Sequence, residues 1–190
     1  MLLDSTYMTP WRVRDSDEAS IDGIAAIYAH WVEHGPASFE LVPPSTEEIA
    51  RRRSESLAAG FPYIVAAERT GSVLGFAYVG WYRTRPAYRF ACEDSVYVSP
   101  SATGCGIGRA LLDDLIVRCT AMQLRVMVAV IGDSGNAASI TLHRRAGFEP
   151  AGLLRSIGWK QGRWVDSVLM SRCLGHGDKQ PPSEHGRLLD

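Results

Sequence analysis

The sequence lacks the features that mark nucleic-acid-binding, membrane and secreted proteins. Its formal net charge is −1, which leaves no electrostatic footprint for nucleic acid or for an anionic membrane surface. No stretch approaches the roughly eighteen consecutive apolar residues that a membrane span requires. The N-terminus also lacks the basic region and apolar segment of a secretory leader. We therefore expect a cytoplasmic protein without nucleic-acid or membrane partners.

Cysteine is scarce, and the spacing of the cysteines matches no metal-binding pattern. The four cysteines stand far apart, at positions 92, 105, 119 and 173, with no C-x-x-C pair. No Cys/His spacing typical of a zinc site is present. We expect free thiols in a reducing compartment and no metal site.

Length and composition are those of one globular domain. The chain has 190 residues, of which 46% are hydrophobic and 22% are charged. This is enough to bury a single core and close to the usual globular mixture. We expect one domain over residues 1–174, followed by a disordered tail over 175–190, which is rich in Pro, Gly and charge.

Hydrophobic periodicity predicts a mixed α/β fold. Capping boxes at Asp15–Glu18 and Ser45–Glu48 are expected to begin the first two helices, and Gly60 and Gly147 to follow helix ends. The predicted order is a strand, two helices, a run of antiparallel strands, then strand-helix-strand-helix-strand with one parallel crossover. The strands are expected at about residues 11–14, 63–68, 73–81, 89–98, 125–131, 152–157 and 163–171, and the later helices at about 107–122 and 136–145.

A glycine-rich loop lies between a predicted strand and a predicted helix. Gly104, Gly106 and Gly108 follow the strand that ends at Pro100. The unpaired N–H groups of a helix start attract anions, and glycine allows a pyrophosphate to approach. No Lys follows as in nucleoside-triphosphate loops, and the dinucleotide pattern G-x-G-x-x-G is one residue short. Coenzyme A and a tight turn without a ligand remain open.

The loop and two further blocks of sequence are interpreted together. They are Val96–Pro100, Thr103–Gly108 and Asn136–Phe148. In this order the blocks resemble the GNAT superfamily of N-acetyltransferases, over about residues 10–172. Segments 85–98, 129–133 and 158–166 are similar in particular to the phosphinothricin and methionine sulfoximine acetyltransferases. The resemblance implies the GNAT fold, a mixed and mostly antiparallel sheet with a parallel crossover pair and flanking helices, and acetyl-CoA as cosubstrate.

The resemblance also implies which residues bind the coenzyme. The strand backbone is expected to bind the pantetheine arm and the thioester carbonyl, and the loop to bind the pyrophosphate. Thr103 and Cys105 depart from the family pattern, so we expect looser coenzyme binding. The implied coenzyme residues are Val96, Tyr97, Val98, Gly104, Cys105, Gly106, Ile107, Gly108, Arg109, Asn136 and Ser139.

Two residues are implied as catalytic. An α-amine is mostly protonated at neutral pH, so acetyl transfer requires a base, and Glu93 is the expected one. Asp94 follows it in the strand and must point to the opposite face. His143 stands where relatives place the proton donor to the departing thiolate. The alternatives are a solvent-facing Glu93 and a merely solvated His143 on a surface helix.

The acceptor site is expected to be lined by Phe39, Arg85, Tyr88 and Glu93. Arg85 is suited to bind the carboxylate of an amino-acid-like amine through two hydrogen bonds. Lys160 and Trp164 belong to the last hairpin, through which related enzymes pair, so we expect a homodimer in which they approach the neighbouring site.

Several activities compete with amino-acid acetylation. A nucleophile elbow at Gly132–Asn136 is rejected because it lacks the second glycine of G-x-S-x-G. A non-catalytic acyl-CoA sensor would share the coenzyme loop. Another amine, such as a different amino acid, a polyamine or a protein N-terminus, is the alternative acceptor.

Overall fold

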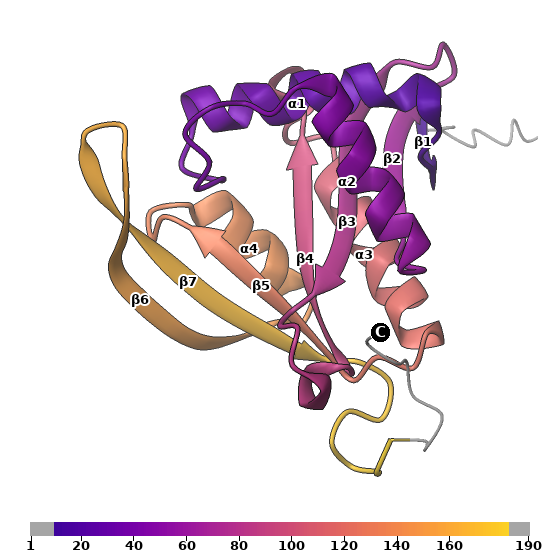
Figure 1. The fold of residues 1–190 in the computed structure, drawn as a ribbon, viewed down its shortest axis with the longest axis vertical. Coiled ribbons are helices and arrows are strands. Elements are labelled where there is room, and N and C mark those ends of the chain that lie inside the picture. The colour runs from indigo at the N-terminus through magenta and orange to yellow at the C-terminus, as the bar shows by residue number, and fades with distance from the viewer. Residues whose placement is uncertain (1–9, 183–190) are drawn as a thin grey trace, which may run out of the picture.

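The computed structural model describes residues 10–182, and the expectations for residues 1–9 and 183–190 lie outside this range. Helices lie on both sides of one central sheet (Figure 1). In chain order they are β1 Trp11–Asp15, η1 Glu18–Ser20, α1 Ile21–His34, α2 Thr46–Ala58, β2 Tyr63–Glu68, β3 Val73–Trp81, η2 Pro86–Tyr88, β4 Ala91–Val98, η3 Pro100–Ala102, α3 Ile107–Ala121, β5 Val126–Gly132, α4 Ala137–Arg145, β6 Glu149–Lys160 and β7 Arg163–Cys173.

The sheet has seven strands in the order β1-β2-β3-β4-β5-β7-β6. Only β4 and β5 are parallel, and α3 forms the crossover between them. Every other neighbouring pair is antiparallel. This confirms the predicted fold class. The last hairpin places β7, not β6, next to β5.

Helices cover both faces of the sheet and enclose two apolar cores. Helices α1 and α2 lie on one face, and α3 and α4 lie on the other (Figure 1). The larger core contains Leu111, Leu112 and Leu115 of α3 packed on the sheet. The smaller one contains Ile24 and Ile27 of α1. Alternate residues of β4 therefore reach different cores.

The first predicted capping box is wrong in its residues. The helical segment begins with a box formed by Asp17 and Ser20, in which Asp17 N–H donates to Ser20 Oγ over 3.4 Å. Asp15 is instead the last residue of β1, and its carboxylate pairs with Arg118 of α3 at 2.5 Å. The second box holds in part, since the Ser45 side chain accepts the N–H of Glu48 at 3.2 Å.

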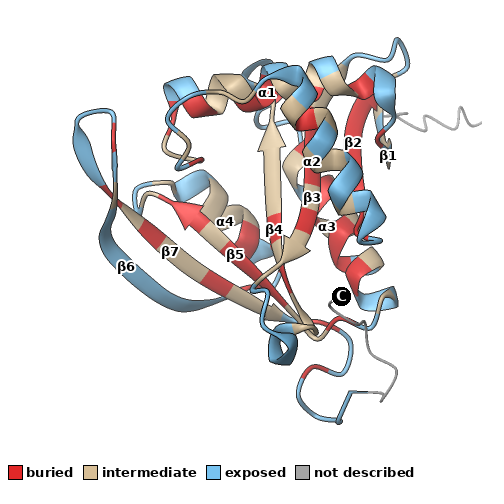
Figure 2. Cartoon of the chain, in the orientation of Figure 1, coloured by how far each residue is buried: buried red, intermediate tan, exposed pale blue. Residues whose placement is uncertain are grey.

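The last hairpin is longer than predicted. Strand β6 runs over twelve residues, nearly all exposed, as the pale blue ribbon in Figure 2 shows. A strand exposed on both faces lacks the alternation of buried and exposed positions on which the prediction depends. Beyond β7, residues 175–178 form turns, and Gly177 N–H donates to Leu174 O at 2.9 Å. Among residues 10–182 we find no helix with the length and apolarity of a membrane span.

Candidate active site

The parallel strands β4 and β5 separate along their length. They pair only from Ala91 with Val126 to Asp94 with Ala129. Beyond this point β4 continues to Val98 and β5 to Gly132, and Figure 1 shows the two strands diverging toward their C-terminal ends. The edge of β4 that faces β5 is thus open over residues 95–98. Peptide groups on such an edge are available to an extended ligand.

A cavity of about 810 Å³ fills this split. The open edge of β4, the glycine loop, the start of α3, the end of β5 and helix α4 form its wall. Asp94 and His143 line the cavity. So does every predicted coenzyme residue except Cys105, namely Val96, Tyr97, Val98, Gly104, Gly106, Ile107, Gly108, Arg109, Asn136 and Ser139. The structure therefore brings together side chains that are up to 49 positions apart, such as Asp94 and His143.

The glycine loop has the conformation that its residues favour. Gly104 and Gly106 adopt φ values of 77° and 80°, a region that is unfavourable for residues with a Cβ. Gly106 caps α3, and the first intrahelical bond of this helix runs from Ala110 N–H to Gly106 O at 3.1 Å. The N–H groups of residues 107–109 therefore point out of the helix start without intrahelical partners. With the helix dipole, they form an anion site that suits a pyrophosphate.

Of the two unusual loop residues, Thr103 lines the cavity and Cys105 does not. Thr103 Oγ1 donates to Pro100 O at 3.2 Å, within the loop itself. Cys105 is exposed, and its thiol lies 3.7 Å from Thr103 O. Asn136 caps α4 by accepting Ser139 N–H at 3.2 Å.

Trp31 and Gly132 are among the cavity residues that sequence reasoning did not assign to a site. The indole N–H of Trp31 in α1 donates to Val98 O at 2.8 Å and so fixes the outer end of the open edge. Gly132 lies against the loop after α1, where an added Cβ would overlap Pro36 O. Trp31 lies in a segment of helical periodicity, which indicates only core packing, and Gly132 was considered only as part of segment 129–133 and of the rejected nucleophile elbow.

Glu93 and Asp94 project from opposite faces of β4, as predicted. Glu93 is half-buried and pairs across the sheet with Gly80 of β3. Burial raises the pKa of the Glu93 carboxyl, the nearby Arg83 lowers it, and Asp94 raises it, with a net increase. Such a carboxyl is a stronger base than an exposed one.

His143 is buried, so the alternative of a solvated surface histidine is wrong. It is 4% exposed and packs edge-on against Phe148. Its Nε2 lies 2.9 Å from Asp94 Oδ2, and its Nδ1 lies 2.8 Å from Ser139 O. Burial lowers the pKa of His143, whereas the hydrogen bond and the charge of Asp94 raise it; the net direction is upward.

Phe39 and Lys160 lie together on the α1–α2 side of the sheet. Phe39 belongs to the loop between α1 and α2, and its ring occupies the space beside Gly158 that a Cβ would fill. Lys160 is 5% exposed and donates from Nζ to Ser38 O at 2.6 Å, so it holds this loop of its own chain. Burial lowers the pKa of the Lys160 ammonium, and Glu40 opposes this effect.

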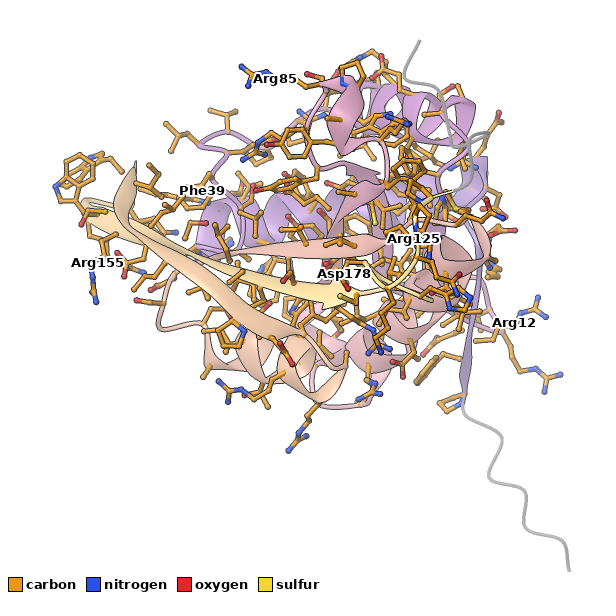
Figure 3. The ribbon with its side chains drawn as sticks, turned by 90° about the horizontal axis from the view of Figure 1, so that it is seen from below. Arg12, Phe39, Arg85, Arg125, Arg155 and Asp178 are labelled. Carbon is orange, nitrogen blue, oxygen red and sulfur yellow. The ribbon has the colours of Figure 1, made fainter. Side chains whose placement is uncertain are left out.

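The remaining acceptor residues are exposed. Arg85 stands out from the surface on the same side of the sheet as Phe39 (Figure 3). Tyr88, in the same segment, is 42% exposed and packs edge-on against Tyr82. Trp164 lies at the end of the last hairpin, with its ring centroid 5.2 Å from that of Trp159. The coenzyme residues thus converge on one cavity, whereas the acceptor residues are spread over a surface.

The described residues contain no group of three or more His, Cys, Asp and Glu side chains suited to hold a metal. The arrangement instead combines an anion site, an open strand edge and two proton-handling carboxyls. This combination can bind a pyrophosphate and its extended arm, and it can transfer protons at the inner end of the split.

Comparison with known proteins identifies the chemistry. The profile of the acetyltransferase (GNAT) family matches residues 23–148. The phosphinothricin N-acetyltransferase of Alcaligenes faecalis is 53% identical over 170 residues, which cover 90% of this chain and 84% of that protein. The L-methionine sulfoximine/L-methionine sulfone acetyltransferase of Pseudomonas aeruginosa is 42% identical over 165 residues, which cover 85% and 94%.

A solved structure extends the similarity to the coenzyme. The phosphinothricin acetyltransferase from Sinorhizobium meliloti, in complex with acetyl-CoA, is similar with a TM-score of 0.90 and 45% identity. The similarity covers 94% of this chain and 96% of that one. These relatives are enzymes, which favours catalysis over an acyl-CoA sensor. The chain belongs to the GNAT family and is an acetyl-CoA-dependent N-acetyltransferase.

Proposed function

We propose that the protein transfers the acetyl group of acetyl-CoA to the α-amine of a small amino-acid-like substrate, such as phosphinothricin or methionine sulfoximine. The substrate class rests on the two relatives named for these compounds. The observation that carries the reaction is the open edge of β4, which leads from the coenzyme loop to the pairing point beside Glu93.

In the proposed reaction Glu93 accepts a proton from the amine, directly or through water. The neutral amine attacks the thioester carbonyl, and the oxygen that gains charge is stabilised by N–H groups of the open edge. The C–S bond then breaks, the nitrogen loses its second proton to solvent as the amide forms, and the departing thiolate takes up a proton. The raised pKa of Glu93, caused by burial, suits it to accept that proton.

The acceptor enters from the α1–α2 side in this proposal. Glu93 lies on that side, as do Phe39 of the α1–α2 loop and Arg85 (Figure 3). Arg85 is exposed, and an exposed guanidinium can still bind a carboxylate through two hydrogen bonds. Because these residues lie on the surface, a second protein copy or the substrate itself would be needed to enclose the site.

We also propose that the enzyme is a cytoplasmic homodimer that pairs through the last hairpin. Trp159 and Trp164 are 57% and 61% exposed, and large exposed apolar side chains that gather on one element are typical of interfaces. All four cysteines are free, as a reducing compartment requires.

A thiol-release assay with acetyl-CoA tests the function. The amine panel contains phosphinothricin, methionine sulfoximine, an amino acid amide without a carboxylate, spermidine and a peptide with a free N-terminus. We expect release with the first two and little with the amide. Release with spermidine or the peptide alone would replace the proposed substrate class, and no release despite coenzyme binding would refute acetyl transfer to these amines.

A further inference from the structure

Asp94 and His143 form a buried pair at the point where β4 and β5 separate. Their side chains are 1% and 5% exposed, and Asp94 Oδ2 lies 2.9 Å from His143 Nε2. Both residues line the cavity assigned to the coenzyme. Asp94 also makes the last pairing contact with β5, through Ala129. The pair therefore occupies the inner end of the split, opposite the anion site of the glycine loop.

The hydrogen bonds of the ring show which of its protons can move. A carbonyl oxygen only accepts hydrogen bonds, so the 2.8 Å contact with Ser139 O assigns a proton to Nδ1 of His143. That proton is held in a hydrogen bond to the backbone of α4. A second proton, when present, lies between Nε2 and Asp94 Oδ2. This second proton lies between two residues that both line the cavity.

The surroundings of Asp94 favour the presence of the second proton. Its other oxygen, Oδ1, is buried without a hydrogen-bond partner among the described residues, and no Lys or Arg of residues 10–182 forms an ion pair with it. A buried carboxylate that faced a neutral ring would be an uncompensated charge, which is costly. One shared proton makes the pair electrically neutral as a whole.

The other charged groups near the pair are few. Glu93 precedes Asp94 on β4 but projects from the opposite face, and its charge and that of Asp94 disfavour each other. On the α3 side, a hydrogen bond with Cys119, burial and the charge of Asp94 raise the pKa of the Cys92 thiol, so it stays neutral. Arg109 of α3 and Arg145 of α4 line the same cavity. Arg109 is bound to Asp113 at 2.6 Å and not to Asp94.

We propose that Asp94 and His143 together hold one proton between Nε2 and Oδ2, and that this shared proton is the one delivered to the departing coenzyme thiolate. Asp94 is thus a positioning residue that acts through His143. The inference rests on the proposed acetyl transfer. It assigns to Asp94 a role that sequence reasoning had not given it.

The proton balance of the step is closed. Attack forms the N–C bond, collapse of the intermediate breaks the C–S bond, and the sulfur takes the shared proton to become a thiol. The ammonium loses one proton to Glu93 or water before attack, and the nitrogen loses a second one to solvent as the amide forms. Glu93 passes its proton to solvent and solvent returns one to the pair before the next turnover, so one proton is released per turnover. No atom is oxidised or reduced.

The first test follows the pair itself, without turnover. Ring NMR titration of the coenzyme-free protein, with the His143 signal assigned through His143→Gln, should show a pKa above the ordinary imidazole value of about 6.5. In Asp94→Asn, which keeps an acceptor for Nε2–H but lacks the charge, burial is opposed only by the Ser139 backbone hydrogen bond, and the pKa should fall below that value. A wild-type His143 that titrates at or below about 6.5 would overturn the proposal, even if no Asp94 variant folds.

The second test follows the reaction. The alkaline limb of the kcat profile should move to lower pH in Asp94→Asn, with kcat at about pH 8 reduced at least tenfold, as expected for loss of general acid catalysis. Asp22→Asn, an exposed carboxyl change on α1, is the matched control and should change neither measurement. An unmoved limb despite a shifted His143 titration would overturn the delivery step. No thiol release by the wild type would refute the proposed function, while the titration would still report on the pair.

Discussion

Replacing Gly106 by alanine separates backbone strain from coenzyme binding. Gly106 caps α3 at φ 80° and ψ −2°, and nothing lies within 4 Å of an added Cβ. The methyl group itself therefore fits. The left-handed conformation costs a residue with a Cβ about 1–2 kcal/mol. The loop can relieve this strain only by rotating the peptide groups that begin the helix.

Gly71 provides the matched control. It lies in the turn between β2 and β3 at φ 97°, again with nothing within 4 Å of an added Cβ. Gly71→Ala should carry a similar backbone cost at a position outside the coenzyme cavity. Both variants should lower the free energy of unfolding by about 1–2 kcal/mol, or the melting temperature by roughly 2–8 °C.

Only Gly106→Ala should weaken the binding of acetyl-CoA. Hydrogen bonds to a charged group are worth about 1.5–3 kcal/mol, so misdirecting one N–H of residues 107–109 should raise the Kd roughly 10- to 150-fold. Titration calorimetry with acetyl-CoA, below the melting range of both variants, measures this. Equal Kd values for Gly106→Ala, Gly71→Ala and the wild type would refute the view that the α3 start binds the pyrophosphate through its backbone.

Three further changes test the remaining parts of the site. Glu93→Gln should lower kcat by about 100-fold or more and abolish the rise of activity with pH through the raised pKa of Glu93, as followed by thiol release. Lys160→Met should leave Ser38 O without its donor, lower the free energy of unfolding by about 1–3 kcal/mol in denaturant titrations, and raise the KM for the amine more than it lowers kcat. Trp164→Asp should reduce the mass measured by sedimentation to that of a monomer, whereas a dimer that persists would place the interface elsewhere.

The parts of the fold that were predictable are those specified by neighbouring residues. Alternation of apolar and polar residues predicts strands that have one buried face. Glycine residues, which readily adopt positive φ, predict the loop. The glycine loop was therefore predictable from its own residues, whereas the open strand end and the coenzyme role of Asn136 were expected only from the resemblance to the GNAT superfamily. The twelve-residue β6 was underestimated because it is exposed nearly throughout.

What escaped prediction depends on contacts between distant residues. Asp94 and His143 are 49 positions apart, and Lys160 reaches Ser38 across 122 positions. In both pairs, the sequence around one residue does not indicate that the other residue will lie beside it in the fold. The burial of His143 was missed for the same reason, since α4 alone suggests a solvated helix and only the strand beneath it supplies the carboxylate.

The adjacency of Glu93 and Asp94 explains how one strand can serve both ends of the proposed reaction. Successive residues of a strand point to opposite faces, so two neighbouring carboxyls are separated by the thickness of the sheet. In the proposed reaction the amine approaches Glu93 from the α1–α2 side, and the thiolate departs toward Asp94 and His143, which line the cavity on the α3–α4 side. The strands part beyond Asp94, and this is where a thioester can reach both faces. The base and the proton donor can therefore hold different protonation states at the same pH, because they do not share one environment.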